Sequence, residues 1–79
     1  MRWSGKAEEW NSVARRLGLA WNLPVGVVYV EDTGDVVRLR YGRKPYIQYR
    51  RGRGKKYGEA IRILAVLVSD RERRNSGWQ

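Results

Sequence analysis

Residues 35–51 have the sequence DVVRLRYGRKPYIQYRR, which predicts two β-strands joined by a short turn at residues 42–44. In both strands apolar and polar side chains alternate with the period of two that a half-buried strand requires. The apolar face carries Val37, Leu39, Tyr41, Ile47 and Tyr49. The other face carries Val36, Arg38, Arg40, Tyr46, Gln48 and Arg50. The two strands therefore predict an antiparallel pair with one buried face and one face in water.

The segments on either side complete the predicted fold. Residues 25–31, VGVVYVE, are rich in β-branched side chains and predict a further strand, which a turn at residues 31–35 connects to the pair. Apolar side chains recur every three or four residues over 5–18 and over 57–73, so each segment predicts a helix, and Ser4 is the expected N-cap of the first. This order predicts an α+β fold (αβββα) with both helices packed on one face of a three-stranded antiparallel sheet.

The second predicted helix is apolar on more than one side. Residues 60–68 are hydrophobic throughout except for Arg62. A helix that is apolar all round needs partners on two faces. We therefore expect a homodimer or a higher homo-oligomer, with its contact near Ile63, Val66 and Leu67. The alternative is that the sheet covers this helix completely.

Length and composition exclude several classes of protein. The 79 residues predict one small domain over 1–79, with an ordered core at about residues 4–73. The chain has no cysteine and no histidine, which excludes disulfides, the usual zinc sites and histidine acid–base chemistry. We expect no metal, no cofactor and no enzymatic activity. No apolar run approaches the roughly 18 residues of a membrane span, so we expect a cytoplasmic protein with no membrane partner.

The positive charge is concentrated in one segment. The chain carries 17 basic and 8 acidic residues, a net charge of +9. Residues 38–56 hold nine bases and no acid, whereas the rest of the chain is neutral. These bases are Arg38, Arg40, Arg43, Lys44, Arg50, Arg51, Arg53, Lys55 and Lys56. Charge this dense repels itself and indicates a polyanionic partner, although a solvated basic loop is the simpler alternative.

The position of this charge in the predicted sheet favours single-stranded nucleic acid. If both helices cover the apolar face, the other face displays arginines, Gln48 and Tyr46, with basic loops at both ends of the last strand. Unpaired bases stack on flat rings while cations follow the phosphates, and neither predicted helix is suited to a DNA major groove. Trp21, at the end of the first helix near Pro24, is placed to line a cleft between helix and sheet.

The arginine-rich helix–strands–helix unit, with YIQYRRGRGKKYG joining a basic aromatic strand to an apolar helix, resembles the ThermoDBP-related proteins. The resemblance covers roughly residues 5–70 and rests on architecture and composition. It implies a single-stranded DNA-binding protein of a thermophilic archaeon that oligomerises and holds DNA in a hydrophobic cleft with a basic rim. Trp21, Tyr46 and Tyr49 would then line the cleft, and residues 38–56 would form the rim.

Three other functions stay open. The same surface suits RNA as well as DNA. A small basic RNA-cleaving toxin has a similar size, and Tyr46, Arg50, Arg51 and Lys56 would be its candidate residues. In an assembly module the second helix would be the working surface and the charge would only maintain solubility. The leading prediction is a sequence-tolerant single-stranded DNA-binding protein.

Overall fold

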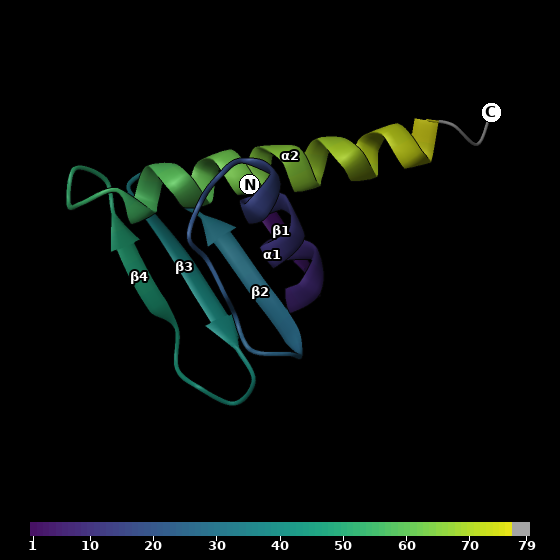
Figure 1. Cartoon of the computed structure of the whole chain (residues 1–79). Coiled ribbons are helices and arrows are strands. Elements are labelled where there is room, and N and C mark those ends of the chain that lie inside the picture. The colour runs from purple at the N-terminus through teal and green to yellow at the C-terminus, as the bar shows by residue number, and fades with distance from the viewer. Residues whose placement is uncertain (77–79) are drawn as a thin grey trace.

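The computed structural model describes residues 1–76, which form an α+β fold (Figure 1). The elements in chain order are β1 (Arg2–Lys6), α1 (Ala7–Arg16), β2 (Val27–Asp32), β3 (Val36–Tyr41), β4 (Ile47–Arg50) and α2 (Lys56–Ser76). The strands form one antiparallel sheet in the order β1-β2-β3-β4. The α+β class is as predicted, but the sheet has four strands and the chain begins with a strand. Trp78 lies outside the described residues.

The extra strand, β1, replaces the expected start of the first helix. Ser4 is not an N-cap but lies within β1 opposite Tyr29, and α1 begins only at Ala7. Trp3 is buried, and its ring covers the core face of β1 so closely that a Cβ atom on Gly5 would lie 2.5 Å from the ring. Because the strand is short and has glycine at one inward position, its alternation is too weak to be recognised from sequence.

The hairpins follow the predicted alternation. Val28, Val30, Val37 and Leu39 are buried on one face of the sheet. Tyr49 pairs with Val37 and Ile47 with Leu39, so the apolar side chains of β4 fall on the same face. The β2–β3 turn contains Gly34 at φ 102°, a conformation that side chains disfavour. The described structure thus shows that the apolar face of the strand pair at residues 35–51 is the buried one, which the sequence predicted only conditionally.

Both helices cover this apolar face, and tryptophans lie at the centre of the core. Trp10 on α1 is completely buried between Trp3 on β1, at 6.0 Å between ring centroids, and Trp21 after α1, at 5.4 Å. Trp21 in turn contacts Tyr49 of β4 at 5.6 Å. This row of rings runs through the core from one edge strand to the other, and α2 packs beside it against β1, β3 and β4.

The structure does not support the expected oligomer contact on α2. Ile63 is 0% exposed and Leu67 5% exposed, so both belong to the core of the single chain, and Val66 is half-buried against that core. The sheet and α1 together cover the side of α2 that was expected to meet a partner. Oligomerisation itself stays a prediction, without Ile63 and Leu67 as its contact.

Candidate nucleic-acid interface

The face of the sheet turned away from both helices is here called the open face. It carries the alternate side chains of each strand. These are Arg2, Ser4, Lys6, Val27, Tyr29, Glu31, Val36, Arg38, Arg40, Tyr46 just before β4, Gln48 and Arg50. Five of the predicted site residues lie here, β1 and β2 contribute six further residues, and β3 also contributes Val36.

Tyrosine rings and guanidinium groups alternate across the middle of the open face. The guanidinium carbon of Arg40 lies 4.9 Å from the ring centroid of Tyr29 and 5.2 Å from that of Tyr46. The guanidinium of Arg38 lies 4.5 Å from the Tyr46 ring. These four residues are here called the tyrosine–arginine stack. Cation–π contacts of this kind hold the rings and the cations in fixed positions on the sheet.

The cations of residues 38–56 are mostly not neutralised by neighbouring acids. Arg38 lies 3.8 Å from Glu31, and Lys56 lies 3.9 Å from Glu59. The other seven bases of this segment form no ion pair among residues 1–76. Their charge is therefore available to an anionic ligand.

Two basic loops lie at opposite ends of β4 (Figure 1). Arg43 and Lys44 are exposed in the β3–β4 connection, and Arg51, Arg53 and Lys55 are exposed between β4 and α2. The sequence predicted this arrangement. A chain of phosphates that passes along β4 would meet cations at both ends of its path.

Three predicted site residues lie on the helix side of the sheet instead. Trp21 is buried, and its indole Nε1 donates to Oε1 of Glu59 at 2.8 Å. Lys56 donates to the carbonyl of Ala20 at 3.2 Å, with its Nζ 4.3 Å from the Trp21 ring centroid. The third, Tyr49, packs its half-buried ring against Trp21. The expected cleft between the first helix and the sheet is filled by these side chains.

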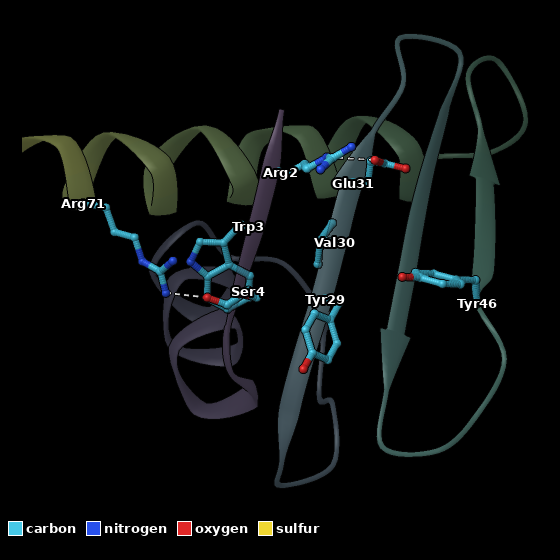
Figure 2. A pocket seen from close by; sticks show the side chains of 8 residues that line it. All are labelled: Arg2, Trp3, Ser4, Tyr29, Val30, Glu31, Tyr46 and Arg71. Carbon is cyan, nitrogen blue, oxygen red and sulfur yellow. Dashed lines mark hydrogen bonds and ion pairs between the residues drawn. The ribbon is translucent and has the colours of Figure 1, made fainter.

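A cavity of about 500 Å³ opens instead over β1 and β2, beside the stack (Figure 2). Its lining residues are Arg2, Trp3, Ser4, Tyr29, Val30, Glu31, Tyr46 and Arg71. Figure 2 shows Tyr46 reaching from the β4 side across β3 toward this cavity. At the far edge Arg71 of α2 donates to the carbonyl of Ser4 and lies over the Trp3 ring.

The sequence reasoning did not identify the residues of this cavity that lie outside residues 38–56. The alternation in VVYVED places Tyr29 and Glu31 on one face, and this signal was present in the sequence. Arg2 lies on the unrecognised strand β1, so no pattern pointed to it. Arg71 reaches the sheet only through the packing of α2, which sequence periodicity does not specify.

Tyr49 gives the core a dependence on alkaline pH. Burial raises the pKa of the Tyr49 phenol above its ordinary value of 10.0, and the neighbouring Tyr41 adds to this. The folded state therefore holds this proton more tightly than the unfolded state, and its contribution to stability is complete below pH 10 and is lost as the pH rises through the folded pKa. We expect Tyr49→Phe to lose less stability than the unmodified protein between neutral and strongly alkaline pH.

Urea unfolding at a series of pH values measures this difference. Tyr29→Phe, which removes a hydroxyl from the exposed face of the sheet, is the matched control and should keep the original pH dependence. The same alkaline loss of stability in Tyr49→Phe would contradict the assignment.

Two further features of the described residues concern metal ions and membranes. Among residues 1–76 no three acidic side chains are grouped closely enough to hold a metal ion. No helix within the same residues combines the length and the apolar character that crossing a membrane requires.

The open face is thus a sheet surface of stacked tyrosines and arginines between two basic loops. Comparison of the chain with protein-family models, with curated proteins and with solved structures finds no match, so a function can be proposed only from this surface.

Proposed function

We propose that this protein binds single-stranded DNA, with little dependence on base sequence, on the open face of its sheet. The observation that carries the proposal is the tyrosine–arginine stack between two basic loops. The proposal keeps the predicted function but replaces the predicted cleft residues Trp21 and Tyr49 by Tyr29 as the partner of Tyr46.

The stack supplies flat surfaces for bases. Tyr29 and Tyr46 are each 42% exposed even though one guanidinium group packs against Tyr29 and two pack against Tyr46. Each ring therefore keeps surface on which a base can stack, and such stacking contributes about 1–3 kcal/mol per base. Because the arginines already hold the rings in place, less conformational entropy is lost on binding.

The same arginines supply phosphate contacts. A guanidinium that lies on an aromatic ring still directs its N–H groups outward in its own plane, where a phosphate can accept them. Arg40 has no carboxylate partner among residues 1–76, so its charge is free for this role. The loops at both ends of β4 extend the cationic path beyond the sheet.

The geometry favours a single strand over a duplex. Both helices pack on the opposite face, so within residues 1–76 no helix projects from the open face toward a major groove. In a duplex the bases are stacked on each other and are not available to Tyr29 and Tyr46. Since the open face carries no histidine and its Glu31 carboxylate is already paired with arginine, we propose binding without catalysis.

A titration of labelled DNA tests the proposal. Fluorescence anisotropy with oligo-dT of about 15 nucleotides, with a duplex of the same length and with oligo-U compares the ligands. If about four phosphates are neutralised, log K should fall with log salt with a slope of about −3 between about 50 and 200 mM salt. We expect oligo-dT to bind more tightly than the duplex.

The outcomes separate the alternatives. Equal affinity for oligo-dT and duplex would remove the single-strand proposal, tighter binding of oligo-U would reassign the ligand to RNA, and no binding at all would remove the nucleic-acid function. Arg40→Glu should weaken binding strongly. Arg62→Glu, the same charge change at an exposed position on α2, is the control and should have a much smaller effect.

A further inference from the structure

We infer that Glu31 accepts a hydrogen bond from the amino group of one base in the bound strand, so that this position of the site prefers cytosine, adenine or guanine over thymine. The inference rests on the proposed function and names a preference within it. Among residues 1–76, Glu31 is the only acid whose side chain lies on the open face, and it lines the cavity beside Tyr29 (Figure 2).

One carboxylate oxygen of Glu31 has no hydrogen-bond donor. Its Oε2 accepts from Nε of Arg2 at 3.0 Å. Its Oε1 lies 3.8 Å from Nη1 of Arg38, and this distance is too long for a hydrogen bond. Oε1 accepts no hydrogen bond from any donor among residues 1–76. An ionised carboxylate can only accept hydrogen bonds, so Oε1 is a free acceptor at the cavity.

The charge of Glu31 determines which part of the strand it can meet. A carboxylate repels phosphate, so the backbone of a bound strand will keep away from it. The two arginines on either side of Glu31 leave the surrounding surface positive for the backbone. Glu31 is therefore suited to the edge of a base and unsuited to the phosphates.

Tyr29 places a base edge within reach of this acceptor. Tyr29 and Glu31 are two residues apart on one face of β2, a separation of about 7 Å along the strand. A base that stacks on the Tyr29 ring extends over a similar width, so its hydrogen-bonding edge can point to Glu31. The cavity of about 500 Å³ between Tyr29, Tyr46 and Glu31 leaves room for one such base.

The donor pattern of the bases gives the preference. Cytosine and adenine each carry an exocyclic amino group, and guanine carries an amino group beside a ring N–H. Thymine offers a single ring N–H between two carbonyl oxygens, and these acceptors repel a carboxylate. Cytosine and thymine are both pyrimidines of similar size, so the pair isolates the contribution of the amino group from that of stacking.

The experiment compares oligo-dC with oligo-dT of equal length at a pH slightly above neutrality, by anisotropy. We expect the unmodified protein to bind oligo-dC about tenfold more tightly, the effect of one hydrogen bond to a charged acceptor. Glu31→Gln removes the charge and adds a donor to the side chain. The ratio of the two affinities should then fall to about one, mainly because oligo-dT binds more tightly. Glu8→Gln makes the same charge change at an exposed position on α1 and should leave the ratio unchanged.

Each result has a distinct meaning. Binding of both oligonucleotides with equal affinity by the unmodified protein would overturn the preference while leaving the proposed function in place. A tenfold ratio that persists in Glu31→Gln would overturn the inference, because the preference would then not come from Glu31. If both affinities also fall together, Glu31 only positions Arg2 and Arg38. Failure to bind either oligonucleotide would remove the proposed function and this inference with it.

Discussion

Replacing Tyr29 and Tyr46 together by alanine is expected to weaken the binding of oligo-dT by about 30-fold or more. Each of these residues is 42% exposed, and each contributes a ring to the open face. Loss of two base–aromatic contacts at about 1–3 kcal/mol each gives this magnitude. The substitution also releases Arg38 and Arg40 from the stack, so their guanidinium groups lose the fixed position that favours a phosphate contact.

The measurement is the same anisotropy titration with three proteins. The conservative pair Tyr29→Phe and Tyr46→Phe keeps both rings, so its affinity should stay close to that of the unmodified protein. Circular dichroism confirms that the alanine variant remains folded, which is expected because both side chains lie on the exposed face. Unchanged affinity in the folded alanine variant would mean that the rings contribute nothing and that the charge alone binds DNA.

Trp10→Ala is expected to cost about 3–5 kcal/mol of folding stability. The Trp10 side chain is completely buried and contacts Trp3 on the edge strand β1 and Trp21 before β2. Its removal leaves a cavity in the core, next to the rigid rings of Trp3 and Trp21. Small domains typically have only about 5–15 kcal/mol of stability, so the variant will be marginally folded or unfolded at room temperature.

Urea unfolding followed by circular dichroism measures this cost. Trp10→Phe keeps an aromatic ring and a smaller cavity, so its loss of stability should be clearly smaller, and it remains measurable even if the alanine variant does not fold. Val25→Ala is a suitable control because Val25 is 86% exposed, and its effect should be negligible. A loss below about 1 kcal/mol in Trp10→Ala would show that the core is not organised around this ring.

The parts of the fold that were predicted from sequence depend on local periodicity. Residues 35–51 alternate, so their two strands and the side chains that share each face of this pair could be assigned. Strand β1 could not be assigned from sequence, because its inward-facing residue Gly5 has no side chain to mark an apolar position. The contact surface of α2 was also misassigned, because a helix that is apolar nearly all round does not show which side meets the sheet.

The candidate site was likewise predicted only where it depends on local alternation. Arg38, Arg40 and Tyr46 share a face by alternation alone, but the neighbour of Arg40 across the sheet depends on the β2–β3 register, which pairs it with Tyr29. Trp21 was expected to line a cleft between helix and sheet because it follows the first helix and lies near Pro24. In the structure Glu59 on α2, 38 residues away along the chain, accepts the hydrogen bond of its indole, and no local pattern contains that information.

The hydrogen bond from Arg71 to Ser4 has a consequence for behaviour at high concentration. β1 is an edge strand of the sheet. Unpaired carbonyl groups along such an edge can accept hydrogen bonds from a strand of another molecule, which leads to aggregation. The guanidinium of Arg71 occupies one of these carbonyl groups and places a positive charge beside the short edge, so an approaching copy meets a blocked acceptor and a like charge. The contact thereby opposes strand-to-strand association of copies along this edge at high protein concentration.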